Sequence, residues 1–340
     1  MTDNLIILKR LVDLLAAGQS VALMLVVEQD GPVPAGQSAM MLVTARGDTS
    51  GTIGGGAPEY EALALARQCL ADGRARLFRL HLTMEAGLLC GGRMSVLIVP
   101  LGPDAGPAGN FFGRAGECLR DGAPVSLRIQ CHDEPDSAGA PGRPEGAGAS
   151  PVRVLKTVDW SLCSPPPLSA PRPAASDAFI FTLTPPPRLL VFGAGHIAAA
   201  LAPMALAAGF RVTVLDDRPE RFAAGLFPET VATRVLPSFA GCLAGPDADA
   251  ATFLLIATYG HRHDRVVLEQ ALATTAAYIG MVGSRRKRAA LSGDLLRAGW
   301  TPADLDRVDS PAGLPIGAET PAEIAVSILA RMIAVRRDAP

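Results

Sequence analysis

A glycine-rich turn in the second half of the chain has the composition of an anion-binding site. Residues 193–198 read Gly-Ala-Gly-His-Ile-Ala, and they follow an apolar strand and precede a helix. Gly193 and Gly195 let the backbone approach a phosphate, to which the helix N-terminus offers N–H donors. Asp216, at the end of the next strand, is placed to accept ribose hydroxyls. His196 is either a helix N-cap or a ligand contact, and the turn either binds a dinucleotide or is structural.

A second turn joins glycine and serine to four consecutive cations at 285–288. Cations at a helix N-terminus oppose the helix macrodipole, and a bound anion would relieve that conflict. Ser284, Arg285 and Lys287 are therefore candidates for holding a phosphate or pyrophosphate together with the N–H groups of the turn. The alternative is a solvated basic helix face.

Three consecutive glycines, Gly54, Gly55 and Gly56, stand before a predicted helix in the first half of the chain. They remove side chains where another backbone or a bulky ligand comes close. Glu59 lies in the first turn of that helix, where a carboxylate is stabilising in any case. This residue either belongs to a ligand site or only caps the helix.

Cys90 is followed by Gly91 and Gly92 and then by Arg93. The flexible backbone would expose the thiol, and the guanidinium would lower its pKa. A thiolate here could bind a soft metal or carry sulfur, and the alternative is an inert cysteine. None of the six cysteines forms a CxxC pair, which favours free thiols in a reducing compartment over a zinc ribbon or a disulfide framework.

The segment 258–264 follows a predicted central strand, where the ligand crevice of an open α/β sheet lies. Its His261 and His263 have no specific match to a zinc site, so hydrogen bonding to a ligand or to the helix start is the favoured interpretation.

Thr320 and Glu323 form a capping box at the start of a C-terminal helix. No Ser-His-Asp order, HExxH or Walker A pattern occurs, so the motifs do not identify a catalysed reaction.

Hydrophobic patterns place these motifs on two domains of an α/β protein. The first half predicts a mixed α+β domain, whereas the second half alternates short strands with helices and predicts a Rossmann-like domain with a parallel sheet. Three prolines at 185–187 mark the junction, so we expect domains at 1–184 and 185–340. Expected helices span 5–17, 58–69, 111–120, 197–208, 265–274 and 286–298, with one more from 321; expected strands span 20–28, 39–45, 77–83, 95–100, 124–127, 189–192, 212–215, 252–257 and 277–282.

Composition excludes several classes of partner. The formal net charge is −2 and aromatic residues make up 5% of the chain, which speaks against a nucleic-acid-binding protein. No uninterrupted apolar run reaches the ~18 residues of a membrane span. The N-terminus lacks the basic segment of a signal peptide, so a cytoplasmic protein is expected.

Taken together, the motifs resemble the XdhC/CoxI family, which are chaperones of molybdenum-cofactor maturation for xanthine dehydrogenase-type enzymes. The resemblance covers most of the chain, and the short motifs occur in the order found in the family. It rests on Gly51–Gly56 with Glu59, Cys90–Gly92, and residues 185–196, 278–287 and 316–325.

The resemblance implies a protein that binds and protects the molybdenum cofactor, as molybdopterin or its cytosine dinucleotide. It would support exchange of a molybdenum oxo group for sulfur with a cysteine desulfurase, and deliver the cofactor to an apo-molybdenum hydroxylase of the xanthine dehydrogenase or aldehyde oxidoreductase type. Cys90 would cap the molybdenum or receive sulfur, and glycines 54–56 would admit the flat pterin. A homodimer is expected, and the chain would be an accessory factor more than an enzyme.

Three departures from the family pattern lie in the second half of the chain. The usual Thr-His-Asp-His stretch is replaced by residues 258–264, Asp309 stands where a histidine is usual, and Pro315 replaces a more typical acidic or polar residue. The main alternative function is an NAD(P)-dependent oxidoreductase using the C-terminal domain. Against this oxidoreductase hypothesis, the sequence shows no obvious set of catalytic acid–base residues beyond His196 and His261. A regulatory protein that senses a nucleotide is the third hypothesis.

Overall fold

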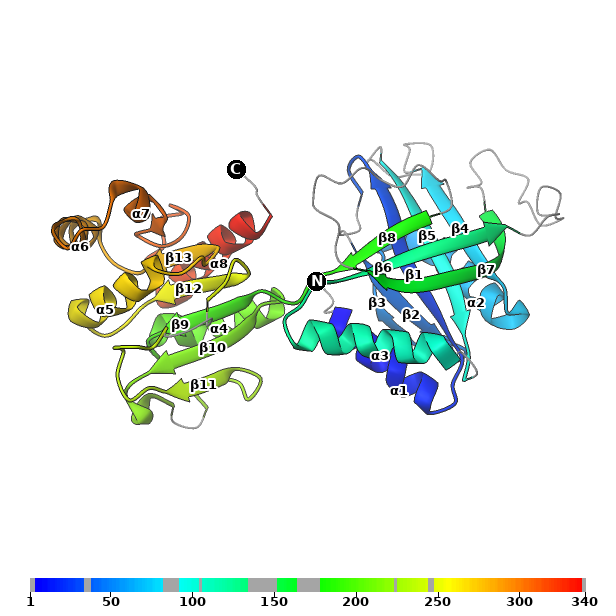
Figure 1. Cartoon of the computed structure of the whole chain (residues 1–340), viewed down its shortest axis with the longest axis horizontal. Helices are drawn as coiled ribbons and strands as arrows, with labels where there is room; N and C mark the ends of the chain where they lie inside the picture. The colour runs from blue at the N-terminus through cyan, green and yellow to red at the C-terminus, as the bar shows by residue number, and fades with distance from the viewer. Residues whose placement is uncertain are drawn as a thin grey trace. The chain divides into compact units, whose positions relative to one another are not determined.

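The computed structural model describes residues 4–33, 38–81, 92–103, 106–133, 152–163, 178–222, 225–243 and 248–337. The chain divides into two compact units, Thr2–Pro185 and Pro186–Pro340 (Figure 1). Each unit has hydrophobic clusters of its own on both faces of its sheet. No helix within the described ranges is long and apolar enough to cross a membrane.

An eight-stranded antiparallel sheet forms the N-terminal unit, with the strand order β3-β2-β1-β5-β4-β7-β6-β8. Its helices cover both faces: α1 and α3 contribute to one hydrophobic cluster and α2 to the other. Strand β1 is therefore buried on both sides over most of its length. The strands are β1 Val21–Asp30, β2 Met40–Thr44, β3 Thr49–Gly51, β4 Ala75–His81, β5 Arg93–Leu101, β6 Val125–Asp133, β7 Val152–Cys163 and β8 Ala178–Leu183; the helices are α1 Asn4–Ala16, α2 Gly56–Asp72 and α3 Gly106–Arg120.

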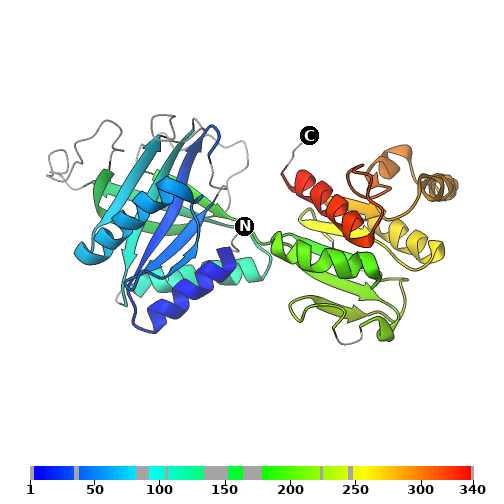
Figure 2. The ribbon, with the colours of Figure 1, turned by 180° about the vertical axis from the view of Figure 1, so that it is seen from behind.

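The C-terminal unit is a doubly wound fold around a six-stranded sheet of order β11-β10-β9-β12-β13-β14, parallel throughout. Helices α4 and α8 lie side by side on one face, as Figure 2 shows, and α5 and α6 cover the other. The strands are β9 Arg188–Phe192, β10 Arg211–Asp216, β11 Ala232–Val235, β12 Thr252–Ile256, β13 Tyr278–Met281 and β14 Val308–Asp309; the helices are α4 His196–Ala207, α5 His261–Leu272, α6 Arg285–Arg297, α7 Pro302–Asp306 and α8 Pro321–Arg336, with a 3-10 turn η3 at Pro219–Phe222.

This arrangement confirms the predicted fold class, a Rossmann-like domain with a parallel sheet after a mixed α+β domain. The strand order reverses between β9 and β12, and ligands of doubly wound folds bind at such a point, beyond the carboxyl ends of the strands. The turns after β9, β10, β12 and β13 therefore surround the expected ligand crevice of this unit.

Several elements differ from the sequence-based prediction. Strands β7 and β8 were not expected, because each borders a segment rich in glycine, alanine or proline, and β7 also carries polar residues at alternate positions. The short elements β3, β11, β14 and α7 were also missed. Helix α5 begins at His261, four residues before the expected start, because the polar run His-Arg-His-Asp is its first turn.

Candidate functional site

The glycine turn after β9 is held against the end of β12. Gly193 has φ +111°, and a Cβ atom added to it would lie 2.2 Å from the carbonyl oxygen of Ala257. No other residue type fits such a close approach of two backbones. The fold by itself thus requires Gly193, whether or not a phosphate binds.

Helix α4 begins directly after this turn with an uncapped N-terminus. Gly195 is the N-cap residue and makes no side-chain capping hydrogen bond, while His196 is exposed as the first helical residue. His196 is therefore not the N-cap that one interpretation expected. The N–H groups of the first turn and the positive end of the helix dipole provide a favourable place for an anion.

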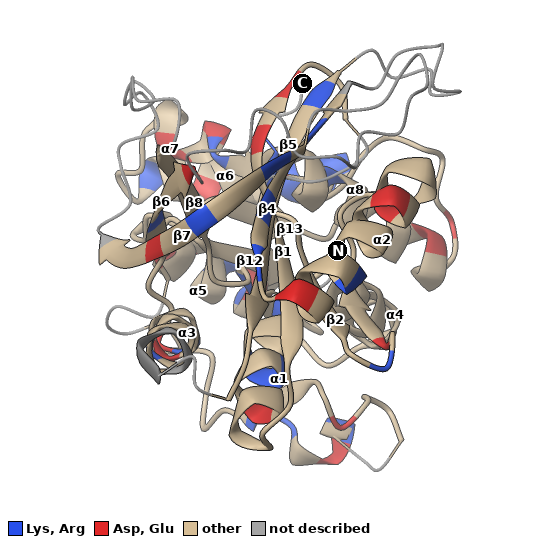
Figure 3. Ribbon diagram, turned by 90° about the vertical axis from the view of Figure 1, so that its right-hand side faces the viewer, with Lys and Arg blue, Asp and Glu red and all other residues tan. Residues whose placement is uncertain are grey.

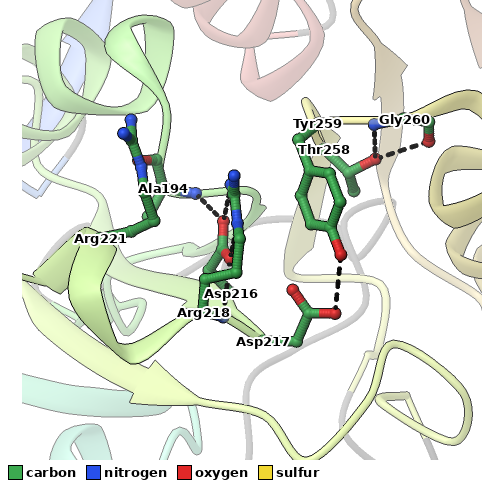
Figure 4. A network of polar contacts seen from close by, with 8 residues as sticks. All are labelled: Ala194, Asp216, Asp217, Arg218, Arg221, Thr258, Tyr259 and Gly260. Carbon is green, nitrogen blue, oxygen red and sulfur yellow. Dashed lines mark hydrogen bonds and ion pairs between the residues drawn. The ribbon is translucent and has the colours of Figure 1, made fainter.

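Asp216 faces the same turn from the end of β10, and its carboxylate is fully buried. One oxygen accepts the Ala194 N–H at 2.7 Å, and the Arg218 guanidinium donates to both oxygens at 2.9 Å (Figure 4). The backbone N–H of Arg218 adds a further hydrogen bond at 3.0 Å. Burial alone would raise the pKa of Asp216, but these hydrogen bonds lower it below its ordinary value.

The predicted contact of Asp216 with a ribose would compete with these internal partners. Both carboxylate oxygens are already occupied, and the group lies beneath Arg218. A nucleotide would have to displace the guanidinium before reaching the carboxylate. The contact remains a prediction, and this conformation does not favour it.

Arg218 also stacks on the ring of Tyr259, which follows β12. Its guanidinium carbon lies 3.9 Å from the centre of the tyrosine ring, and the Tyr259 hydroxyl donates to Asp217 at 3.1 Å. Arg221 donates to the carbonyl oxygen of Ala194 at 3.1 Å. Figure 4 shows these side chains converging from the segments after β10 and β12 on the turn that follows β9. Two arginines and an aromatic ring therefore lie around the turns at this switch point.

The loop after β12 is organised by a buried aspartate. Asp264 accepts the hydroxyl of Thr258 at 2.7 Å and its N–H at 3.2 Å. It also forms an ion pair with Lys287, whose ammonium donates to the carbonyl oxygen of Val282 at 3.0 Å. The aspartate thus joins the start of α5 to the start of α6, a role that sequence reasoning did not assign to it.

The candidates for a phosphate site at α6 are consequently not equivalent. Lys287 is turned inward onto Asp264, and the Ser284 hydroxyl accepts the Lys287 N–H at 3.2 Å as a helix cap. Arg285 is exposed in the first turn. Of the three residues predicted to hold a phosphate, Arg285 is the one whose side chain is not engaged within the described part of the chain, and it is free to meet an anion.

The histidines of this loop have separate environments. His261 is exposed, and the His263 ring lies 4.5 Å from the Tyr259 ring, centre to centre. Among the described residues, no group of three or more His, Cys, Asp or Glu side chains could hold a metal ion.

Asp309, which replaces a usual histidine, belongs to a separate polar network under α8. It accepts the hydroxyl of the buried Tyr278 at 2.7 Å and the N–H of Gly313 at 3.1 Å, and Arg331 lies 3.8 Å away. Burial, together with the charge of Asp309, raises the pKa of Tyr278 well above its ordinary range. This network ties β13 and β14 to the loop before α8.

In the N-terminal unit, the glycine loop is ordered by Glu59. Its carboxylate accepts the N–H groups of Ile53 and Gly55, both at 3.0 Å, and the hydroxyl of Thr52 at 2.5 Å. Gly54, Gly55 and Gly56 all have positive φ, which explains the triple glycine. Glu59 therefore acts as the cap that one interpretation predicted, and the loop conformation accounts for the motif without a ligand.

Cys90 and Gly91 lie outside the described residues, so their roles stay predictions. Gly92 is described: a Cβ atom on it would lie 2.3 Å from the carbonyl oxygen of Pro32. Because β3 and β1 run in the same direction and β5 runs against them, Gly92 and the loop at 54–56 lie at the same end of the sheet. Two of the predicted motifs thus lie toward the same end of this sheet.

The described cysteines are free thiols suited to the hydrophobic core. Cys69, Cys131 and Cys242 are buried, and burial raises the pKa of Cys242 to about 11 and also that of Cys69. Thiols with raised pKa values are poor nucleophiles and poor metal ligands.

Comparison with known proteins gives two matches to models of one family. The model described as the XdhC Rossmann domain matches residues 189–332, and the model described as the XdhC and CoxI family matches residues 14–81. Among solved structures, a protein described as a xanthine dehydrogenase from Bacillus halodurans is similar, with a TM-score of 0.74 at 23% identity over 97% of this chain and 96% of that one. This likeness extends the shared fold through both units.

Three curated relatives differ in how much of them is matched. The uncharacterized protein YqeB of Escherichia coli is 36% identical over 45% of this chain and 28% of its own length. A protein of Bacillus subtilis that is named as a probable subunit of xanthine dehydrogenase is 36% identical over 48% of this chain and 47% of its own. The chain thus spans less than half of either relative. PaoD of Escherichia coli, named a molybdenum cofactor insertion chaperone, is 24% identical over 98% of this chain and 89% of its own length.

Proposed function

Since the chain belongs to the XdhC/CoxI family, we propose that it is an accessory protein of molybdenum-cofactor maturation, which binds the cofactor as cargo and passes it to a molybdenum hydroxylase. The observation that carries the proposal is the similarity to PaoD, which runs through both units and nearly the whole chain. The other two curated relatives share only about half of this chain.

The residues around the switch point of the C-terminal unit support cargo binding better than dehydrogenase chemistry. The uncapped start of α4, with His196, Arg218 and Arg221 around it, suits a phosphate or diphosphate group of the cofactor. An NAD(P)-dependent enzyme would need Asp216 or a substitute at the ribose, and this carboxylate is enclosed by its own chain. NAD(P) is therefore the weaker candidate.

The finer steps of the proposal come from the family resemblance. The protein would shield the cofactor, either as molybdopterin or as its cytosine dinucleotide, while a cysteine desulfurase supplies sulfur. It would then release the cofactor to an apo-enzyme of the xanthine dehydrogenase or aldehyde oxidoreductase type. Cys90 is proposed as the thiol that faces the molybdenum, and the protein is proposed to act as a homodimer in the cytoplasm.

Purification from cells that make the cofactor tests this function. We expect molybdenum, measured by mass spectrometry, together with a pterin that becomes fluorescent after oxidation. Adding the loaded protein and a cysteine desulfurase to an apo-hydroxylase should restore hydroxylase activity. Bound NAD(H) with turnover of a small alcohol or aldehyde would refute the proposal, and so would a bound nucleotide without any affinity for the pterin.

Cys90→Ala separates the thiol from the rest of the site. We expect this variant to retain the fold but to lose most of its ability to activate the apo-hydroxylase. Cys118→Ala, at a half-buried cysteine on α3, is the matched control. Full activation by Cys90→Ala would leave the thiol without a role in transfer.

A further inference from the structure

We propose that the N-terminal unit binds the C-terminal segment of a partner protein as a short additional β-strand, in a gap of the sheet between β5 and β7. This gap, called the β4 gap, continues the line of β4 beyond its first residue and lies between residues 99–102 and residues 156–160. None of the motifs above includes these residues. The β4 gap serves a partner chain, whatever cofactor the protein carries.

The β4 gap exists because β4 is shorter than its two neighbours. Strand β4 begins at Ala75, which pairs with Leu155 of β7, and the next residue of β4 pairs with Ile98 of β5. Both neighbours continue past this point, β5 to Leu101 and β7 to Cys163. Their outer edges stay paired there, with β1 and β6. Among the described residues, neither neighbour has a partner strand on its inner edge beyond Ala75.

A hollow of about 510 Å³ occupies the β4 gap. Its lining includes every residue of 99–102 and every residue of 156–160. A hollow over one face of a sheet would be lined by alternate residues of a strand, because side chains alternate between the two faces. Lining by consecutive residues therefore means that the hollow lies between the edges of the two strands.

The dimensions of the β4 gap suit one extended chain. Neighbouring strands lie roughly 4.8 Å apart, so two strands that flank a missing one leave room for a single backbone between them. Four residues of strand span roughly 13 Å, which corresponds to the length of the edge at 99–102. About half of the residues in each edge direct their N–H and C=O groups into the gap, since these groups alternate between the two edges of a strand. An added strand pairs with such groups.

The antiparallel order of the sheet sets the direction of the bound chain. Strand β4 is antiparallel to both β5 and β7, so a chain that pairs with both in the same way runs in the direction of β4. Its C-terminal end then meets Ala75, where β4 itself occupies the line. Because the gap is closed at this end, a free C-terminus fits it, whereas an internal segment would have to turn sharply out of the sheet.

A basic residue stands at the closed end of the β4 gap. Lys156 directly follows the last residue of β7 that pairs with β4, and its side chain is exposed. Within the described part of the chain it makes no ion pair or hydrogen bond, so its ammonium can attract a C-terminal carboxylate. Asp159 lies farther along β7 and pairs with His132 at 3.1 Å. Figure 3 shows the basic residues of β7 in blue and an acidic residue in red.

An apolar wall lies on one side of the β4 gap. Phe111 of α3 and Trp160 of β7 are half-buried, with ring centres 6.2 Å apart, and both pack against the hydrophobic cluster that includes Val99 and Leu101. Since side chains of a bound strand alternate between the faces, every second residue meets this wall. The expected ligand is therefore a segment of about four residues with a free carboxylate and with apolar residues at alternate positions.

Selection from peptide pools on the immobilised full chain tests this site. The probe is a pool of N-acetylated pentapeptides of random sequence with a free C-terminal carboxylate, and the control pool carries a C-terminal amide. We expect the first pool to yield peptides with apolar residues at alternate positions, identified by mass spectrometry, and the amide pool to yield none. A selected peptide is then titrated by Trp160 fluorescence in a Trp300→Phe background.

Lys156→Glu reverses the charge at the closed end and leaves the core intact, because the side chain is exposed. It should weaken binding of the selected peptide roughly tenfold or more, as the loss of a charged hydrogen-bonding partner does. Arg67→Glu is the matched control, at an exposed arginine of α2, which packs on the other face of the sheet. This variant should bind like the wild type.

Hydrogen exchange with and without the selected peptide locates the bound backbone. Alternate amides of 156–160 should exchange more slowly in the complex, because they gain partners in the added strand. The proposal is refuted if neither pool yields a peptide, if both pools yield peptides equally, if Lys156→Glu binds like the wild type, or if binding leaves exchange at 156–160 unchanged. None of these outcomes bears on the role in molybdenum-cofactor maturation.

Discussion

Replacement of Arg218 by alanine should destabilise the C-terminal unit, because it removes the counter-charge of a buried carboxylate. Asp216 would lose the two bonds from the guanidinium and keep the N–H of Ala194 and that of residue 218. Breaking a fully buried ion pair costs about 3–5 kcal/mol. Since 30% of the Arg218 side chain is exposed and two donors remain, we expect a loss of about 2–3 kcal/mol.

The two tryptophans of the chain allow each unit to be followed by itself. Trp160 belongs to the N-terminal unit and Trp300 to the C-terminal unit. In a Trp160→Phe background, urea unfolding monitored by Trp300 fluorescence reports the free energy of unfolding of the C-terminal unit. Arg262→Ala, which removes an exposed arginine at the start of α5, is the matched control.

The destabilisation caused by Arg218→Ala should depend on pH, because Asp216 must be ionised to interact with Arg218. The pKa of Asp216 is lower in the folded chain than in the unfolded chain, so its contribution to stability is present above the unfolded pKa. The contribution is lost as pH falls through the folded pKa. The difference between wild type and Arg218→Ala should therefore be largest near neutral pH and shrink below about pH 4. A difference no larger than that of Arg262→Ala, or one that does not change with pH, would refute the reasoning.

Three further substitutions test the contacts around the sites, each measured by urea unfolding. Gly193→Ala should cost more than about 2 kcal/mol by Trp300 fluorescence, because a Cβ atom would meet the Ala257 carbonyl oxygen. Tyr278→Phe should cost about 1–3 kcal/mol in the same signal, since Asp309 loses its hydroxyl donor. Glu59→Gln should cost about 1 kcal/mol by Trp160 fluorescence, as the capping acceptor at the start of α2 loses its charge. Costs near zero would contradict each assignment.

The sequence predicted the Rossmann-like unit well, because its signals are local. The glycine turn at 193–198 and the alternation of short strands and helices need no knowledge of distant contacts. Strands β7 and β8 escaped prediction, because their pairing with β4 and β6 involves residues far away in the chain. The polar alternate positions of β7 made it resemble a loop, and β8 is a short strand between two proline-containing segments.

The candidate sites were predicted less completely, because charge alone does not say where a side chain points. Lys287 was expected to hold a phosphate, but its ammonium turns toward Asp264 on a neighbouring helix. Asp264 itself was hidden in a run of polar residues that resembled a set of ligands.

The contact between Gly193 and Ala257 has a consequence for how such chains diverge. Because the neighbouring strand end excludes every larger residue, selection for folding alone preserves this glycine. A lineage that exchanged one ligand for another, or lost its ligand altogether, would still carry the same glycine fingerprint. In this fold the glycine motif therefore persists even when the ligand changes. A change of ligand specificity would instead be found in the side chains around the turn, such as Arg218 and Tyr259.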